Sequence, residues 1–282
     1  QRTPDVRICQ PKTLAECLQR LDESNGSAKP VAGGTDLLVN WHHHVKDDWT
    51  LLDLSNLKDE LGQMRLTDDT LELGALTTYW DVIRSDEVSR AFPLLPQAAQ
   101  QVGAIQIQTR GTWAGNIANG SPAADGVPVL MAYDARVVLQ SATTKREVPL
   151  DTYFTGYKQS VRQPNELITA IGLPRKPRSV EWFEKVGQRR AQAIAKLGVA
   201  VVRDDTTWRI AANSVNPYVC RCPNLEAKLQ ANQTFTTPEE LQKVLEQDIT
   251  PIDDIRSTAA YRTKVLSRVL FYGLAEQPPT TP

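Results

Sequence analysis

The spacing of apolar positions along this chain of 282 residues predicts a mixture of helices and strands. Apolar residues that recur every three or four positions indicate amphipathic helices, whereas polar–apolar alternation indicates strands with one buried face. We expect helices over residues 13–21, 37–45, 78–84, 93–102, 238–247 and 258–272. We expect strands over residues 31–32, 50–54, 70–75, 135–140, 147–149, 166–173, 180–186, 198–203 and 207–212.

This pattern is interrupted at residues 106–134, where the sequence QIQTRGTWAGNIANGSPAADGVPVLMAYD is rich in Gly, Ala, Ser, Thr and Asn. Gly111, Gly115 and Gly120 permit backbone conformations and close approaches that a Cβ would block. Short donors and acceptors are supplied by Thr112, Asn116, Asn119 and Ser121. Because the run lacks the bulky side chains that a core helix needs, we expect its backbone to lie against a polar, extended small molecule.

A second glycine-rich loop, GGTD at residues 33–36, separates the expected strand at 31–32 from the expected helix at 37–45. Glycines that lead into a helix direct several backbone N–H groups toward one point, where the helix dipole also favours negative charge. The loop therefore suits a phosphate or pyrophosphate, although a plain strand–turn–helix connection has the same sequence. Its spacing matches neither the Rossmann dinucleotide fingerprint nor the P-loop, so both of those sites are disfavoured.

Taken together, the two loops resemble the FAD loops of the molybdenum hydroxylase flavoprotein subunits. This family includes the medium subunit of carbon monoxide dehydrogenase and the FAD domain of xanthine dehydrogenase. The resemblance rests on VAGGTDL at residues 31–37, TRGTWAGNIA at 109–118 and SPAAD at 121–125. Four further similar segments follow the family's order: PKTLAE at 11–16, FTGY at 154–157, ELITAIGLP at 166–174 and DDIRSTAAYR at 253–262.

The resemblance implies an α+β fold, with a two-part FAD-binding domain of the vanillyl-alcohol-oxidase/PCMH type followed by a smaller C-terminal α+β domain. We expect the FAD-binding domain over residues 1–174, with its first lobe at 1–55 and its second lobe at 56–174. The C-terminal domain is expected over residues 178–275, after the proline-rich break PRKP at 174–177. Residues 276–282 are expected to form a disordered tail.

The resemblance also implies which residues bind noncovalent FAD. From the first loop these are Lys29, Pro30, Val31, Ala32, Gly33, Gly34, Thr35, Asp36 and Leu37. From the rest of the chain they are Val102, Gly111, Thr112, Trp113, Ala114, Gly115, Asn116, Ala118, Asn119, Asp125, Ile168 and Lys185.

Individual roles follow from these positions. The backbone amides of Gly33 and Gly34 would reach the pyrophosphate, while the carboxylate of Asp36 would cap the following helix and point away. Asn119 and Asp125 would share hydrogen bonds with the ribityl or ribose hydroxyls, although both residues could equally cap turns.

Three further residues are placed near the flavin ring. Ile168 would pack on a face of the ring. Lys185 would lie near the cofactor, or alternatively would be a solvated surface lysine. Trp113 stands where the family commonly has Ile, and its ring would cover part of the isoalloxazine and restrict oxygen access, or would simply pack in the core. In the same segment Ala114 replaces a family glycine, so the local backbone can differ.

The function implied by the resemblance is electron transfer. Substrate would be hydroxylated at molybdopterin on a large partner subunit, and electrons would pass through [2Fe–2S] clusters on a small partner subunit to FAD on this chain. The final acceptor would be NAD, oxygen or a quinone, in a heterotrimer or its dimer. The basic pair Arg189–Arg190 would attract an anionic acceptor such as NAD, or would form a solvated loop. We expect no catalytic side chain on this chain.

Two other interpretations remain open at this point. The chain could be a stand-alone FAD-dependent oxidoreductase of the same superfamily, which would need its own acid or base or a histidine for covalent flavin attachment. It could also be a structural subunit that has lost FAD, although the retained glycines and Asp125 argue against this.

Composition narrows the possible partners and compartment. A net charge of −1 predicts no nucleic-acid partner, and no apolar run approaches the roughly 20 residues that span a membrane. The N-terminal sequence has no signal-peptide pattern. With few, irregularly spaced cysteines, we expect reduced thiols and a cytoplasmic location. We expect no metal site, because consecutive side chains at residues 42–44, all histidine, diverge by about 100° each on a helix.

Overall fold

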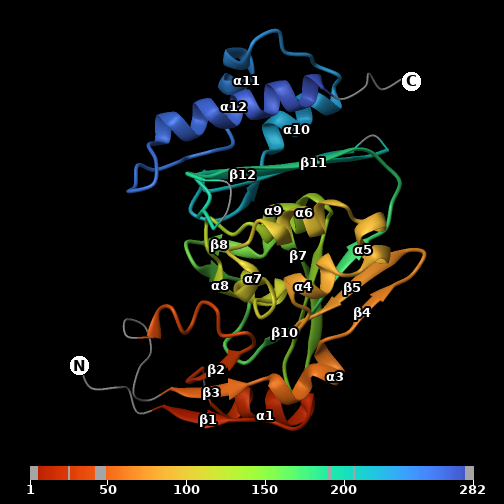
Figure 1. Ribbon diagram of the computed structural model, residues 1–282, viewed down its shortest axis with the longest axis vertical. Helices are drawn as coiled ribbons and strands as arrows, with labels where there is room; N and C mark the ends of the chain where they lie inside the picture. The colour runs from red at the N-terminus through yellow and green to blue at the C-terminus, as the bar shows by residue number, and fades with distance from the viewer. Residues whose placement is uncertain (1–5, 25, 42–48, 190–191, 206, 277–282) are drawn as a thin grey trace.

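The computed structural model describes residues 6–24, 26–41, 49–189, 192–205 and 207–276, and its elements are stacked along one long axis (Figure 1). At one end lies a three-stranded parallel sheet in the order β1 (Arg7–Cys9), β3 (Thr50–Asp53), β2 (Ala28–Val31). Helix α1 (Leu14–Glu23) follows Thr13, whose hydroxyl accepts a hydrogen bond from the amide of Glu16 and so caps the helix.

The middle of the molecule is built on an antiparallel sheet of five strands. Their order is β4 (Met64–Leu66), β5 (Thr70–Gly74), β10 (Leu167–Pro174), β6 (Arg136–Gln140), β7 (Lys145–Pro149). Two short helices, η1 (Ser55–Leu57) and α3 (Lys58–Leu61), precede β4. The segment between β5 and β6 forms α4 (Tyr79–Ile83), α5 (Asp86–Ala91), α6 (Leu94–Gln100), α7 (Ile105–Gln108), α8 (Trp113–Asn119) and α9 (Gly126–Ala132). A short segment, η2 (Leu150–Thr152), β8 (Phe154–Gly156) and β9 (Gln159–Ser160), connects β7 to β10.

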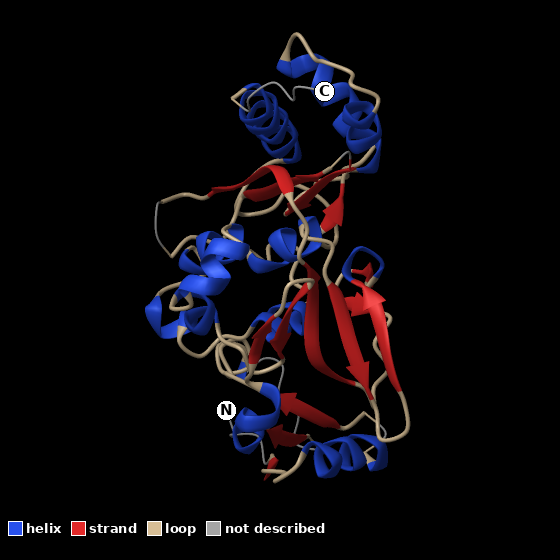
Figure 2. Cartoon of the chain, turned by 90° about the vertical axis from the view of Figure 1, so that its right-hand side faces the viewer, coloured by secondary structure: helices blue, strands red, loops and turns tan. Residues whose placement is uncertain are grey.

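The C-terminal part is a four-stranded antiparallel sheet between two helical layers, as Figure 2 shows. Its strands are β11 (Arg178–Val186), β12 (Leu197–Asp204), β13 (Thr207–Asn213) and β14 (Cys220–Arg221). One face packs against α6 and α9, and the other is covered by α10 (Pro223–Gln230), α11 (Pro238–Leu245) and α12 (Ala259–Ala275). Strand β12 is therefore buried on both sides: Val199 and Val201 belong to the outer core, and Ala200 and Val202 to the core shared with the middle sheet.

Most of the expected helices and strands are present within a few residues of their expected bounds, including α1, α4, α6, β5, β10 and β11–β13. The expected helix at 37–45 is described only in part, because residues 42–48 lie outside the described residues, as do residues 277–282 of the expected tail. Residues 106–134 lie outside the expected helices. They include α8 and α9, and every residue of α9 is buried.

Candidate cofactor-binding site

The first glycine-rich loop turns sharply after β2. Gly34 has a φ of +71°, in the left-handed region that glycine adopts without strain. The chain then coils, with the amide of Leu38 donating to the carbonyl of Gly34 (2.9 Å) and that of Asn40 donating to the carbonyl of Asp36 (3.2 Å). Amides at the start of such a coil have no partner within it, so this end of the loop presents backbone donors to an anion.

Asp36 does not cap this coil as expected. Its Oδ1 accepts a hydrogen bond from Nδ2 of Asn40 (3.3 Å), one turn further along, and its side chain is exposed. The carboxylate is therefore held on the surface of the coil by a side-chain amide rather than by the first backbone amides.

The two glycine-rich loops touch each other through their backbones. A Cβ on Gly33 would lie 1.8 Å from the carbonyl oxygen of Arg110 and 3.2 Å from the nitrogen of Gly111. In return, Nε of Arg110 donates a hydrogen bond to the carbonyl of Gly33 (3.2 Å). Since only glycine permits this approach, the fold brings together two loops that the sequence separates by more than 70 residues.

Small residues in the second loop permit close packing of its two helices. Thr112 caps α8 by accepting a hydrogen bond from the amide of Gly115 (3.0 Å), and Gly120 ends it with a φ of +61°. A Cβ on Gly126, the first residue of α9, would lie 3.0 Å from the ring of Trp113 and 3.1 Å from Oδ1 of Asn116. The glycine and alanine content that suggested a ligand therefore also serves contact between α8 and α9.

Trp113 is a core residue. Its side chain has no exposed surface, and its ring centroid lies 4.9 Å from that of Tyr79. Its backbone amide donates to the carbonyl of Thr77 (3.3 Å). Of the two alternatives for Trp113, these contacts favour packing in the core, because the ring lies under α9 where Gly126 leaves room for it.

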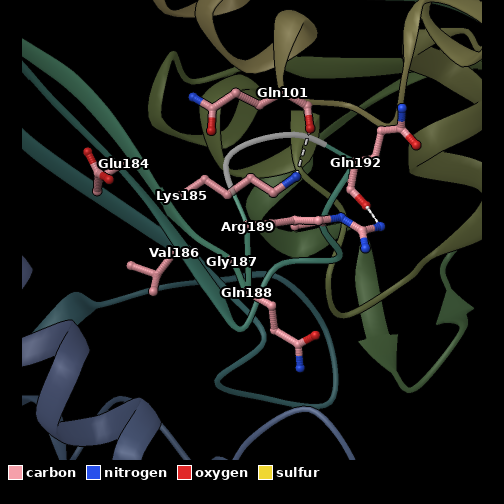
Figure 3. Close-up of a pocket in the computed structure, with 9 residues that line it drawn as sticks. Gln101, Glu184, Lys185, Val186, Gly187, Gln188, Arg189 and Gln192 are labelled. Carbon is pink, nitrogen blue, oxygen red and sulfur yellow. Dashed lines mark hydrogen bonds between the residues drawn. The ribbon is translucent and has the colours of Figure 1, made fainter.

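Asp125 and Lys185 form a buried ion pair behind the second loop. Oδ2 of Asp125 accepts a hydrogen bond from Nζ of Lys185 (2.6 Å), which also donates to the carbonyl of Gln101 (2.7 Å; Figure 3). Burial raises the pKa of the Asp125 carboxyl to about 6, although the neighbouring ammonium group of Lys185 opposes this rise. Asp125 does not act as a helix cap, because its side chain makes no capping hydrogen bond to α9. Lys185 is not a solvated surface lysine, because its side chain is only 5% exposed.

The other expected contact residues differ in accessibility. Gly115 and Ala118 are exposed, and the half-buried residues are Pro30, Val31, Ala32, Thr35, Leu37, Val102, Asn116 and Asn119. Gly111, Thr112, Ala114 and Ile168 are buried. Lys29 is directed back to its own lobe, where Nζ donates to the carbonyl of Gly26 (2.7 Å) and lies 5.5 Å from the ring of Trp49.

A cavity of about 460 Å³ opens beside Lys185 (Figure 3). It lies between Gln101, at the end of α6, and the segment that joins β11 to β12. In this segment Nη2 of Arg189 donates to the carbonyl of Gln192 (2.7 Å), whereas Arg190 lies outside the described residues. An adjoining hollow of about 420 Å³ shares Arg189 and adds Lys196 and Arg256. Nothing in the sequence indicates a role for Gln101, because its contribution is a backbone carbonyl.

Two expected absences concern membranes and metals. Across the described ranges, no helix has the length and apolar character needed to cross a membrane. No three His, Cys, Asp or Glu side chains in those ranges converge as metal ligands, and His42, His43 and His44 lie outside them.

All four cysteines are free thiols, as expected. Burial raises the pKa of Cys17 and of Cys220 to about 11, so both thiols are protonated and poorly nucleophilic at neutral pH.

Comparison with protein families divides the chain into two matches. Residues 4–176 match the FAD-binding domain in molybdopterin dehydrogenase, and residues 182–277 match the carbon monoxide dehydrogenase flavoprotein C-terminal domain. The chain belongs to the FAD-binding subunits of the molybdenum hydroxylases.

Relatives of this flavoprotein subunit agree with that assignment. It is 30% identical to the xanthine dehydrogenase FAD-binding subunit of Escherichia coli O157:H7, covering 90% of this chain and 89% of the relative. It is also 30% identical to the carbon monoxide dehydrogenase medium chain of Hydrogenophaga pseudoflava, covering 92% of each. The solved structure of carbon monoxide dehydrogenase from the same organism superimposes with a TM-score of 0.89 over 98% of each chain, at 28% identity. The expected α+β fold, a FAD-binding domain followed by a C-terminal domain, is confirmed.

The residues of this flavoprotein subunit suit FAD. A dinucleotide needs backbone donors for its pyrophosphate, and the coil after Gly34 begins with amides that have no partner within the coil. It also needs acceptors for its hydroxyl groups. Oδ1 of Asp125 and Oδ1 of Asn116 are both buried with no hydrogen-bond donor among the described residues. Buried acceptors without donors are costly, so their presence beside the loops is consistent with donors supplied by a cofactor.

Proposed function

We propose that this subunit holds FAD along its two glycine-rich loops and serves as the electron-transfer component of a molybdenum hydroxylase. The backbone contact between Gly33 and Arg110 carries the proposal, because it brings together two loops that lie more than 70 residues apart in the sequence. FAD, when bound there, takes up electrons one at a time and gives them up in pairs.

The chain's own residues would bind and orient the cofactor. Backbone amides around Gly33 and Gly34 would face the pyrophosphate, and the exposed helix positions Gly115 and Ala118 would allow close approach on the other side. Asp125, held by Lys185, offers its remaining oxygen to a hydroxyl group. This work of positioning needs no general base or nucleophile on the chain.

The partners are proposed from the same family. Electrons would arrive from [2Fe–2S] clusters on a small subunit, and substrate would be oxidised at molybdopterin on a large subunit. The names of the relatives support this assembly, since one is a dehydrogenase FAD-binding subunit and the other a dehydrogenase medium chain. The choice of substrate would then lie with the large subunit.

The Gly33→Ala variant tests the site directly. The added methyl group would overlap the carbonyl oxygen of Arg110, so the loops must separate and we expect FAD affinity to fall at least tenfold. The affinity is measured by titrating the FAD-free chain with FAD and following flavin fluorescence. Gly172→Ala is the matched control, because a Cβ there meets nothing within 4 Å. Unchanged affinity in Gly33→Ala would refute the proposed site.

NAD is the acceptor that the cavity supports best among NAD, oxygen and a quinone. Arg189 lines both hollows, and Lys196 and Arg256 add positive charge in the second, where a dinucleotide phosphate could bind. We expect Arg189→Ala in the complete enzyme to raise the apparent KM for NAD about tenfold, while the rate with oxygen stays within a factor of two. An equal effect on both acceptors, or none on NAD, would contradict this assignment.

A further inference from the structure

Three residues form a row across the C-terminal sheet, directly behind the second loop. Lys185 of β11 pairs with Gly198 of β12, and Gly198 pairs with Asn213 of β13. Residues that pair directly across strands point to the same face of a sheet. This face is the one that packs against the middle of the molecule, because Ala200 and Ala211, two positions away, belong to the shared core.

Each end of the row binds one residue of the second loop, and these two residues are consecutive in the sequence. Nδ2 of Asn213 donates to the carbonyl of Ala124 (3.0 Å), and Nζ of Lys185 donates to the carboxylate of Asp125 (2.6 Å). Next to the row, the amide of Ser214 donates to the carbonyl of Pro122 (2.7 Å). The end of the second loop is therefore fixed by the C-terminal sheet at three points.

The middle of the row is shaped to admit the amide of Asn213. A Cβ on Gly198 would lie 2.9 Å from Nδ2 of Asn213, so only glycine leaves the side chain undisturbed. Asn213 has no exposed surface, and its Oδ1 has no donor among the described residues. Burying the Asn213 amide costs desolvation free energy that an apolar side chain would avoid. The hydrogen bond from Asn213 to the carbonyl of Ala124 offsets part of this cost.

We propose that the row Lys185–Gly198–Asn213 is a clamp that sets the position of Asp125 for FAD, with Asn213 and Gly198 as positioning residues that do not touch the cofactor. The inference rests on the proposed function, since it assumes that Asp125 faces FAD. The C-terminal domain would then contribute to FAD affinity through β12 and β13, although neither strand contributes a residue to the proposed binding surface.

Two variants test the clamp in independent ways. Gly198→Ala crowds the amide of Asn213, and Asn213→Ala removes it. We expect each to weaken FAD binding by the full-length chain about tenfold in a flavin-fluorescence titration, and to shift the visible circular dichroism of the bound flavin. Gly172→Ala is the control for the first variant. Asn216→Ala is the control for the second, because its amide holds the carbonyl of Asp248 (3.0 Å) within the C-terminal part.

The outcomes separate the clamp from general destabilisation and from the proposed site. The clamp is supported if only Gly198→Ala and Asn213→Ala weaken FAD binding, while Asn216→Ala lowers the melting temperature with unchanged affinity. It is overturned if both clamp variants bind FAD within a factor of two of the parent, or if Asn216→Ala weakens binding equally. The variant Asp125→Asn separates the proposed FAD site from the clamp. Unchanged FAD affinity in this variant refutes the site itself. Weakened affinity in this variant, together with normal affinity in both clamp variants, refutes the clamp alone.

Discussion

At the scale of single residues, the buried pair Asp125–Lys185 is the costliest feature of the site. Removing two charges from water costs several kcal/mol, which is recovered only while both partners remain. The raised pKa of Asp125 shows that burial outweighs the attraction of Lys185 in this pair. The native state therefore binds a proton more readily than the unfolded state, whose aspartate pKa is about 3.9.

The variant Lys185→Met should reveal this cost. It leaves the Asp125 carboxylate buried without a counter-charge, so we expect the free energy of unfolding to fall by about 3 kcal/mol at pH 8. In the parent, the contribution of Asp125 to stability decreases as pH rises from about 4 to about 6. Without Lys185 the native pKa is higher still, so this loss continues above pH 6. Urea unfolding of the FAD-free chain at pH 5 and pH 8 measures the difference.

We expect Lys185→Met to lose less unfolding free energy at pH 5 than at pH 8, because the Asp125 carboxyl of the folded variant is protonated at pH 5. The double variant Lys185→Met/Asp125→Asn is the control and should recover most of the lost stability at pH 8. A penalty independent of pH would mean that Lys185 stabilises the fold by packing and not by pairing with Asp125.

At the scale of elements, the second loop depends on its short helices. Helix α8 has only seven residues, so its ends contribute a large share of its stability. Thr112 supplies the N-terminal cap, and its hydroxyl is already used by the amide of Gly115. We therefore interpret Thr112 as a residue that stabilises the second loop by capping α8.

Thr112→Ala should cost about 1 kcal/mol of unfolding free energy, the usual effect of losing an N-cap. Thr112→Ser should keep most of this stability, because serine retains the accepting hydroxyl. Thermal unfolding of the FAD-free chain measures both. If the two variants were equally destabilised, the methyl group of the buried threonine would be the important part and the cap would be secondary.

At the scale of the whole molecule, the middle part and the C-terminal sheet share an apolar core, and Arg178 at the β10–β11 junction adds polar contacts between them. The guanidinium group of Arg178 lies 4.5 Å from the ring centroid of Phe92 and 4.4 Å from that of Tyr133. It also donates to the carbonyls of Ala91 (2.9 Å) and Pro174 (3.3 Å). These contacts fasten the first strand of the C-terminal sheet to the helices of the middle part.

Arg178→Met should weaken this joint. The rings of Phe92 and Tyr133 lose a cation, and two carbonyls lose a donor. We therefore expect the free energy of unfolding to fall by about 3 kcal/mol. Calorimetry should show a lower melting temperature and a transition that broadens or splits as the cores uncouple. Arg203→Met is the control, since Arg203 stacks on Trp208 (5.2 Å) inside the C-terminal sheet. A single sharp transition in Arg178→Met would show that other contacts couple the cores.

Local patterns were enough to predict most of the longer strands and helices, whereas α10 and the short helices α5, α7, α8 and α9 were not predicted. Strands such as β10 and β12 have apolar runs whose length and β-branched content indicate burial. Helix α9 contains Gly126 and Pro128, which lower helix propensity, and it forms because its whole length is buried against β12 and β13. Propensity is a local quantity and could not include that packing.

The site was predictable only where a motif lies in one stretch of chain. The glycine loops and Asp125 were predicted because their residues are adjacent in sequence and resemble a family. Asn213, Gly198 and the carbonyl of Gln101 were not found, because nothing near them in sequence indicates which loop they contact. For the same reason the sequence left two alternatives open for Trp113, since its burial depends on Gly126 of the next helix.

The sequence by itself determined the longer helices and strands, the two loops and the family. Each of these depends on neighbouring residues: the period of apolar side chains, the freedom of glycine, and motifs of a few positions. Only the tertiary structure decided that Gly33 rests on Arg110, that Trp113 is buried, and that β11–β13 hold the end of the second loop. These are contacts between distant segments, and their energies depend on distance and burial, which exist only once the chain has folded.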